Sequence, residues 1–103
     1  GLPCGGSRAI LDDLLRGELG FDGVVVADYY TTMLLCSFHR VAADKGEAGR
    51  MALEAGLDVD LPQLDCFGAP LKAEIESGRV PMALVDRAAG LTGVSFVGIN
   101  EIW

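Results

Sequence analysis

The chain has 103 residues, and 50% of them are hydrophobic, which is a large apolar surface for a short polypeptide to cover alone. Its formal net charge is −7, and Lys and Arg form no cluster, so the sequence offers no footprint for a nucleic-acid backbone or an anionic membrane surface. No apolar run approaches the roughly 18 residues of a membrane span.

The first half of the chain predicts a helix followed by a strand. Ser7 is expected to cap a helix over about residues 8–19, whose Leu and Ile side chains share one stripe. Gly20 is expected to close this helix in a left-handed conformation. The Val residues at 24–26 form a β-branched run without polar alternation, which is typical of a strand covered on both faces. After Tyr30 the pattern loosens into a loop with a short helical piece.

The second half predicts a further alternation of helices and one strand. The expected elements are, in order, a helix over 45–55 ended by Gly56, a strand over 57–61 stopped by Pro62, a loop over 63–69, a helix near 70–77 closed by Gly78, and a helix from Pro81 through Ala88. Helices that alternate with strands are typical of α/β proteins with a parallel sheet.

A carboxylate, Asp28, follows the first predicted strand, and Tyr29 and Tyr30 come directly after it. Ligands collect at the carboxyl ends of parallel strands. Sugar chemistry needs a carboxylate to meet an oxocarbenium ion and flat aromatic faces to hold a ring. The alternative for Asp28 is a residue that caps a turn or helix, and the alternative for Tyr29 is packing above the sheet. Tyr30 is expected to pack under the following helix.

The residues around Asp28 follow a recognisable order: an aliphatic pair, a basic residue, an acidic residue, a glycine, an aliphatic triplet and the Asp. Here these are Leu14-Leu15, Arg16, Glu18, Gly23, Val24-Val25-Val26 and Asp28. This order resembles the nucleophile signature of family 3 glycoside hydrolases, the β-glucosidase and β-xylosidase family. Ala27 departs from it, because the family has Ser or Thr there. The resemblance extends over about residues 2–89, through His39 to Ala42, Glu54 to Val59, Asp65 to Gly68, Gly78 to Val80 and Val85 to Ala88.

The resemblance implies an α/β fold in which this chain is a fragment, the last two strand-helix units of a TIM-like (β/α)8 barrel of about 250 residues. Residues 1–89 would be the C-terminal portion of the catalytic barrel domain. Residues 90–103 would be a divergent or frameshifted tail, because the stretch 91–98 breaks helical periodicity. The implied activity is that of a retaining exo-β-glycosidase acting on terminal β-D-glucosyl or β-D-xylosyl residues, with Asp28 as catalytic nucleophile and Tyr29 as substrate-binding residue.

The resemblance also implies a substrate and partner domains. Its substrate would be an oligosaccharide or glycoside, and the remainder of the barrel and a following domain would supply the other groups, including a Glu as acid/base. The chain alone is expected to be inactive. Neither a metal nor an organic cofactor is implied. The three cysteines are expected to be free thiols, which slightly favours the cytoplasm but leaves the cellular location undetermined.

Five more residues are candidates for the site, each with a structural alternative. His39 is expected to tie down the loop after Asp28, and a sugar contact is its alternative. Asp58 and Asp60 share one face of the second strand, where they either cap loops or line the pocket. Asp65 and Cys66 are candidates for substrate contact, because their loop follows that strand.

Two other interpretations of the chain remain open. In the first it is a small α/β signalling or binding module with Asp28 as phospho-acceptor or ligand carboxylate. A receiver domain of that kind needs a lysine at the end of a late strand, whereas Lys45 and Lys72 both lie in helical stretches. In the second it is a non-functional gene remnant, which the absent initiating Met and the unusual tail favour.

Overall fold

The computed structural model describes the backbone of residues 2–61 and 65–95, and the side chains of the same ranges as far as residue 90. Its elements are η1 (Cys4–Gly6), η2 (Ala9–Glu18), α1 (Thr31–Ser37), α2 (Lys45–Ala55), α3 (Ala69–Glu76) and α4 (Met82–Ser95). Pro62, part of the loop after it and residues 96–103 lie outside the described residues. The expected helices are all confirmed, with differences at their ends.

The first long helix differs from expectation at its start. The N-cap position of η2 falls on Arg8, and no side chain makes a capping hydrogen bond there. Ser7 instead contributes its backbone carbonyl, which accepts hydrogen bonds from the N–H groups of Ile10 and Leu11. The prediction that Ser7 caps the helix is therefore wrong by one residue, because the turn of η1 ends directly before it. At the other end Gly20 has a φ of 70°, as predicted for a left-handed closing residue.

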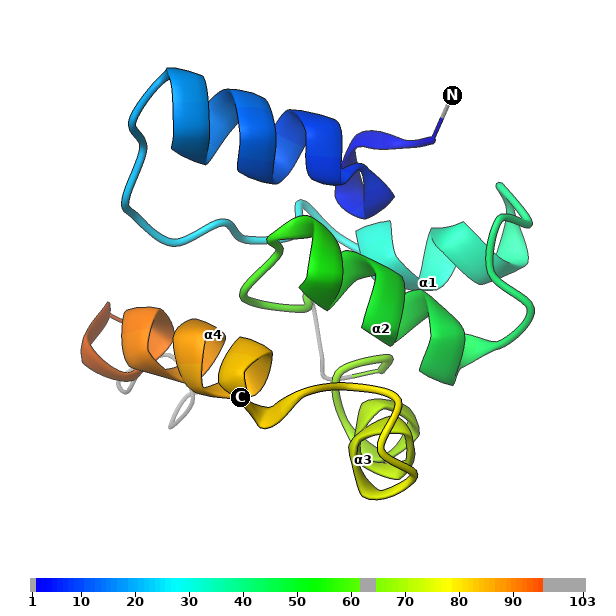
Figure 1. Cartoon of the computed structure of the whole chain (residues 1–103). Helices are drawn as coiled ribbons and strands as arrows, with labels where there is room; N and C mark the ends of the chain where they lie inside the picture. The colour runs from blue at the N-terminus through cyan, green and yellow to red at the C-terminus, as the bar shows by residue number, and fades with distance from the viewer. Residues whose placement is uncertain (1, 62–64, 96–103) are drawn as a thin grey trace.

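The helix α2 is the centre of the fold. It contacts η1, η2, α1, α3 and α4, as Figure 1 shows. Its buried face consists mainly of small residues, namely Ala48, Gly49, Ala52 and Ala55, with Leu53 beside them. A Cβ added at Gly49 would lie 2.8 Å from the carbonyl oxygen of Cys66. Small residues on α2 thus allow the chain around it to approach closely.

Two extended segments occupy the places of the predicted strands. They run parallel and form a single bridge, between Val26 and Val59. The N–H of Ala27 donates to the carbonyl of Val59 at 2.9 Å. Within the described residues, however, neither segment forms a regular strand, so the chain is mostly helical rather than visibly α/β. The two segments are extended and parallel where the strands were predicted, but the prediction that they form regular strands is wrong.

The shortness of this pairing has a physical cause. The N–H of Val25 donates to the Asp58 side chain at 2.9 Å rather than to a backbone carbonyl. Each segment also has only the other to pair with among the described residues, and a two-stranded pairing is marginally stable. The ladder is therefore limited to the bridge and a few neighbouring hydrogen bonds.

The last helix is longer than predicted. The backbone of α4 remains helical from Met82 to Ser95, although a break after about residue 90 was expected. Arg87 fastens this helix to the core, because its Nη2 donates to the carbonyl of Leu53 at 3.0 Å. The domain boundary at residue 89 stays a prediction.

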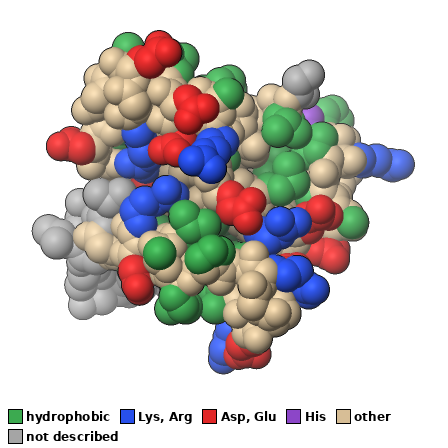
Figure 2. Space-filling view, in the orientation of Figure 1, with side chains coloured by type: hydrophobic (Ala, Val, Ile, Leu, Met, Phe, Trp, Pro, Cys, Tyr) green, Lys and Arg blue, Asp and Glu red, His purple; other side chains and the backbone are tan. Residues whose placement is uncertain are grey.

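Several large apolar side chains remain on the surface. Ile10, Leu14 and Leu19 of the predicted stripe are 39%, 42% and 68% exposed, whereas Leu11 is buried. Figure 2 shows hydrophobic side chains between acidic and basic ones on the face in view. No described helix is both long enough and apolar enough to cross a membrane. Part of the predicted stripe therefore faces outward, while Leu11 packs into the core.

Candidate active site

Asp28 leaves the core at the end of the first extended segment. The residue before it, Ala27, is 3% exposed and is hydrogen-bonded to the second segment, whereas Asp28 itself is exposed. The N–H of Tyr30 then donates to the carbonyl of Leu61 at 2.8 Å. The backbone is thus held on both sides of Asp28, and the carboxylate projects where the sequence predicts it.

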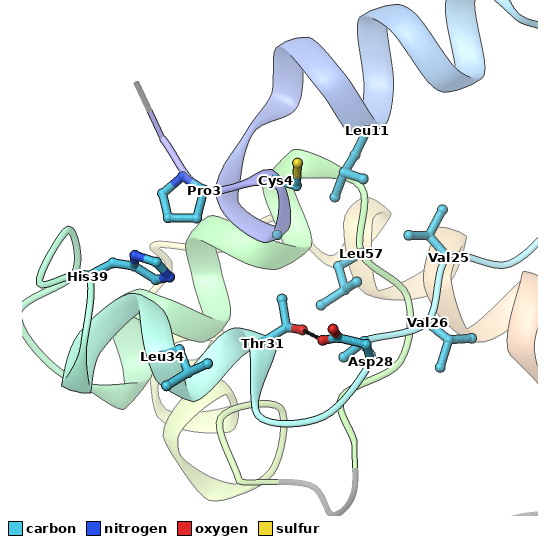
Figure 3. A pocket seen from close by; sticks show the side chains of 12 residues that line it. Pro3, Cys4, Leu11, Val25, Val26, Asp28, Thr31, Leu34, His39 and Leu57 are labelled. Atoms are coloured by element: carbon cyan, nitrogen blue, oxygen red, sulfur yellow. Dashed lines mark hydrogen bonds between the residues drawn. The ribbon is translucent and has the colours of Figure 1, made fainter.

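The carboxylate of Asp28 is held by its own turn. Its Oδ1 accepts hydrogen bonds from the backbone N–H of Tyr29, at 2.9 Å, and from the hydroxyl of Thr31, the first residue of α1 (Figure 3). The Thr31 hydroxyl, and after it the Tyr29 N–H, lower the pKa of Asp28 below its ordinary value. Hydrogen bonds donated to a carboxylate favour its charged form. Asp28 is therefore ionised at neutral pH, as a nucleophile must be.

The turn between Asp28 and α1 depends on Tyr30. Its φ of 59° is left-handed, which is uncommon for a residue with a large side chain. This conformation turns the chain sharply into α1, and the Tyr30 side chain remains 44% exposed. The prediction that Tyr30 packs under the following helix is therefore wrong. Its ring instead meets the ring of Tyr29 edge-on, with centroids 6.5 Å apart.

Asp28 lies on the wall of a mostly apolar hollow of about 370 Å³. Thr31 and His39 are the other polar residues of this wall, and Figure 3 shows His39 across the hollow from Asp28. The remaining walls are formed by Pro3, Cys4, Gly5, Leu11, Val25, Val26, Ala27, Leu34 and Leu57. Tyr29 is 56% exposed and is not among the lining residues. The hollow thus combines an ionised carboxylate with apolar surface.

His39 is held through its backbone and ring. Its N–H donates to the carbonyl of Leu34 at 2.8 Å, directly after α1. Its ring meets that of Phe38 edge-on at 5.1 Å. These contacts support the predicted role in tying down the loop, and a sugar contact by His39 stays a prediction.

The candidate residues of the second segment and of the loop after it make contacts within the fold. Asp60 is buried and accepts hydrogen bonds from the N–H groups of Cys66 and Phe67, at 2.9 and 3.3 Å. Asp60 therefore caps the loop, which is one of the two roles predicted for it. Asp65 pairs with Lys45 at 2.8 Å. The Cys66 side chain is fully buried, and this burial raises the pKa of its thiol to about 12. The expectation that Cys66 contacts a substrate is therefore wrong.

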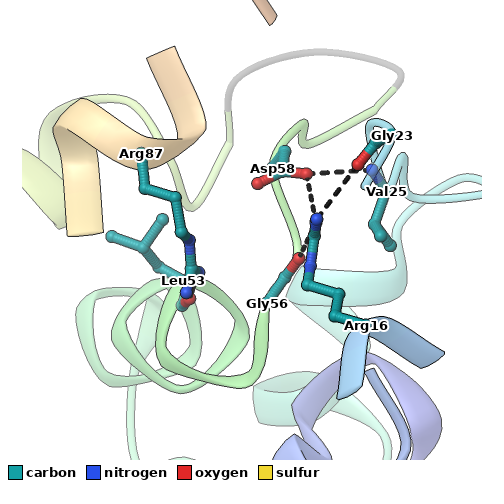
Figure 4. Close-up of polar contacts among 7 residues, drawn as sticks. All are labelled: Arg16, Gly23, Val25, Leu53, Gly56, Asp58 and Arg87. Atoms are coloured by element: carbon teal, nitrogen blue, oxygen red, sulfur yellow. Dashed lines mark hydrogen bonds and ion pairs between the residues drawn. The ribbon is translucent and has the colours of Figure 1, made fainter. Parts of the chain in front are cut away.

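Arg16 connects the two extended segments that carry the site (Figure 4). Its guanidinium donates to the carbonyls of Gly23 and Gly56, at 3.0 and 3.1 Å, and pairs with Asp58 Oδ2 at 2.6 Å. The same Oδ2 accepts the N–H of Val25. The Asp58 side chain is fully buried and that of Arg16 is 13% exposed. Asp58 thus holds the register of the segments and does not line the hollow.

Thr31 is the site residue that sequence reasoning missed. A hydroxyl three positions after a carboxylate, at the expected start of a helix, was the available signal. Gly5 lies against it: a Cβ added at Gly5 would overlap Thr31 Cγ2. In the described part of the chain, no group of three or more His, Cys, Asp or Glu side chains is placed to hold a metal ion.

The chain belongs to glycosyl hydrolase family 3, since residues 1–91 match that family's N terminal domain. It is 38% identical over 87 residues to a lysosomal beta glucosidase of Dictyostelium discoideum, which covers 84% of this chain and 11% of that protein. It is 43% identical over 61 residues to a beta-xylosidase of Formosa agariphila, which covers 59% of this chain and 8% of that one. The chain spans about a tenth of the length of these relatives.

Solved structures agree with this assignment. A beta-glucosidase from Listeria innocua superposes with a TM-score of 0.80 at 30% identity, over 88% of this chain and 13% of that one. A b-glucosidase from Erythrobacter marinus gives 0.79 at 33% identity, over 85% and 12%. The predicted family is confirmed, and the arrangement in Figure 1 matches part of the fold of these enzymes.

Proposed function

We propose that this chain forms the last two strand-helix units of the catalytic (β/α)8 barrel of a retaining exo-β-glycosidase. Its substrates are terminal β-D-glucosyl or β-D-xylosyl residues of oligosaccharides or glycosides, and Asp28 is the nucleophile. The observation that carries the proposal is the placement of Asp28: an exposed, ionised carboxylate at the end of a paired extended segment, on the wall of a hollow. Relatives named as β-glucosidases and β-xylosidases support this substrate class.

The proposed reaction has two steps. The Asp28 carboxylate attacks the anomeric carbon, and the bond to the departing oxygen breaks as an acid protonates that oxygen. Water then attacks the same carbon and releases Asp28, while the acid's conjugate base takes the water's proton. Retention needs two carboxyl groups about 5–5.5 Å apart. We place the second group, a Glu, in a following domain, so the chain by itself is expected to be inactive.

Two observations support a larger barrel around these residues. The side chains of Ile10 and Leu14 on η2, and of Leu19 directly after it, are left exposed, and the neighbouring helices of a barrel would cover such a stripe. The match to the family domain runs to residue 91, close to the proposed boundary at residue 89. We therefore keep residues 1–89 as the barrel portion and 90–103 as a tail.

The lysines weigh against a receiver-type signalling module. Lys45 pairs with Asp65 at 2.8 Å, and Lys72 approaches Glu76 at 4.0 Å. Both lysines project from helices, α2 and α3, and neither lines the hollow beside Asp28. A receiver site needs a lysine next to its phospho-acceptor carboxylate.

Covalent labelling tests the proposed nucleophile most directly. A 2-deoxy-2-fluoro glycoside with a good leaving group is expected to leave its sugar on the nucleophile, because hydrolysis of the intermediate becomes slower than its formation. We expect the complete protein that contains this chain to be labelled on Asp28, within the tryptic peptide from Gly17 to Arg40. The measurement is peptide sequencing by mass spectrometry.

Two variants sharpen the labelling experiment. Asp28→Asn is expected to prevent labelling, whereas Asp22→Asn, an exposed Asp of the same peptide, is expected to leave it unchanged. An adduct on Asp58 or Asp60 would mean that the wrong carboxylate had been assigned. Turnover of the glycoside without any trapped label would argue against a covalent intermediate.

We also propose that Tyr29 holds a sugar ring beside the hollow. Its ring is more than half exposed and lies next to the carboxylate in sequence. Loss of an aromatic contact costs about 0.5–1.5 kcal/mol, so Tyr29→Ala is expected to raise KM by about 3- to 10-fold. Tyr29→Phe keeps the ring and should resemble the wild type. Steady-state kinetics of the complete protein provide the measurement, and an unchanged KM in Tyr29→Ala would remove this residue from the binding site.

A further inference from the structure

The Thr31 side chain is better fixed than a surface hydroxyl usually is. It is half-buried at the start of α1, and its Cγ2 lies against the buried Gly5. The residue before it is held from both sides, because the N–H of Tyr30 donates to the Leu61 carbonyl and its carbonyl accepts the N–H of Leu34. A β-branched side chain has a restricted χ1 angle. Backbone and packing together therefore keep the hydroxyl directed at Asp28.

Both hydrogen bonds to the Asp28 side chain fall on the same oxygen. The Tyr29 N–H and the Thr31 hydroxyl donate to Oδ1, and Figure 3 shows the hydrogen bond from Thr31 to one of the two carboxylate oxygens. No other side-chain hydroxyl of the described residues reaches this carboxylate. The residue before Asp28 is Ala27, which carries no hydroxyl. The two carboxylate oxygens are thus unequal before any substrate is bound.

We propose that Thr31 is a positioning residue for Asp28: its hydroxyl occupies Oδ1 and leaves Oδ2 as the oxygen that attacks the sugar. This inference rests on the proposed role of Asp28 as nucleophile. The bond from Oδ2 to the anomeric carbon forms as the bond to the departing oxygen breaks, and that oxygen takes its proton from the acid. Oδ1 then becomes the carbonyl oxygen of the ester and keeps both hydrogen bonds.

The same hydroxyl assists the second step. When water attacks the anomeric carbon, the bond to Oδ2 breaks and negative charge returns to the carboxylate. A hydrogen bond to a charged group is stronger than one to a neutral group. The Thr31 hydroxyl therefore stabilises the departing carboxylate more than it stabilises the ester. Its removal is expected to slow release of the sugar.

The Thr31 hydroxyl also affects how the activity falls at acidic pH. Its hydrogen bond lowers the pKa of Asp28, so the carboxylate stays ionised to lower pH. Without the hydroxyl the pKa rises, and the protonated, inactive fraction grows at any given acidic pH. The loss of activity then begins at higher pH on the acidic side, while the alkaline side, which reports the acid/base group, does not move.

The test compares Thr31→Val with Thr31→Ser and Thr32→Val in the complete protein. Thr31→Val removes the hydroxyl at nearly constant shape, whereas Thr31→Ser keeps it. Thr32 is the matched control, because its buried hydroxyl has no hydrogen-bond partner among the described residues. The probes are 4-nitrophenyl β-D-glucopyranoside and β-D-xylopyranoside, and kcat and kcat/KM are measured across pH.

For Thr31→Val we expect kcat to fall by about 10-fold, because the variant lacks a hydrogen bond to the carboxylate that is released in the second step. We also expect the acidic limb of kcat/KM to move to higher pH. Thr31→Ser and Thr32→Val should keep the wild-type limb. Thr31→Ala is the second variant if Thr31→Val does not fold. An acidic limb that is unchanged without the hydroxyl, or that moves equally in Thr32→Val, would overturn the inference.

The outcomes separate this inference from the proposed function. If Asp28→Asn remains active in the same assay, the proposed nucleophile is wrong and the role of Thr31 is wrong with it. If Asp28→Asn is inactive while Thr31→Val retains the wild-type kcat and pH profile, only the inference about Thr31 fails.

Discussion

Replacing Asp28 with Asn is expected to lower kcat/KM of the complete protein by several orders of magnitude. The amide has the size of the carboxylate, and its oxygen can still accept the hydrogen bonds from Tyr29 and Thr31 that now fall on Oδ1. The exchange therefore removes the charge and the nucleophile with little change in structure. Removing a covalent nucleophile leaves only binding and the remaining catalytic groups to accelerate the reaction.

The measurement is steady-state hydrolysis of an aryl β-glycoside, with thermal unfolding as a check on the fold. Because Asp28 is exposed and Asn can keep its hydrogen bonds, we expect no large change in the midpoint of unfolding. Asp22→Asn, another exposed carboxylate on the same peptide, controls for the loss of a negative charge. A variant at Asp28 that retains more than about a tenth of the wild-type kcat/KM would exclude this residue as nucleophile.

Removing Arg16 is expected to destabilise the fold by about 3–5 kcal/mol, because it leaves a buried carboxylate without its partner. The Asp58 side chain is fully buried, and Arg16 is 13% exposed. Arg16 also satisfies the carbonyls of Gly23 and Gly56. Arg16→Met fills a similar volume but provides none of these donors. Urea unfolding of the complete protein is the measurement.

The second half of this ion pair provides a further comparison. Asp58→Asn keeps an acceptor for the N–H of Val25 and removes the charge that Arg16 neutralises. We expect the double variant to be less destabilised than the sum of the two single variants, as for residues in direct contact. Lys72→Met is the control, because its pair with Glu76 is exposed and should contribute under about 1 kcal/mol. If Arg16→Met and Lys72→Met have similar effects, the ion pair does not hold the two segments together.

Local chemical signals were enough to predict most of the helices. The bounds of α2 agree with expectation because its ends are determined by nearby residues: Asp44 caps its first turn by accepting the Glu47 N–H at 2.8 Å, and Gly56 ends it at a φ of 119°. The position of Asp28 was predictable for the same reason, since a β-branched run leads directly to it. The resemblance to family 3 rested on the order of residues alone.

Two of the missed features depend on residues that are distant in sequence. The two extended segments form only one bridge because the Asp58 side chain takes the Val25 N–H, 33 positions away. Cys66 is buried because the chain packs against α2 at Gly49, and that approach depends on the absence of a Cβ. Neither pairing has a signature in the local pattern. Side-chain competition for backbone donors, and the space that a glycine leaves, become visible only when the folded chain brings these residues together.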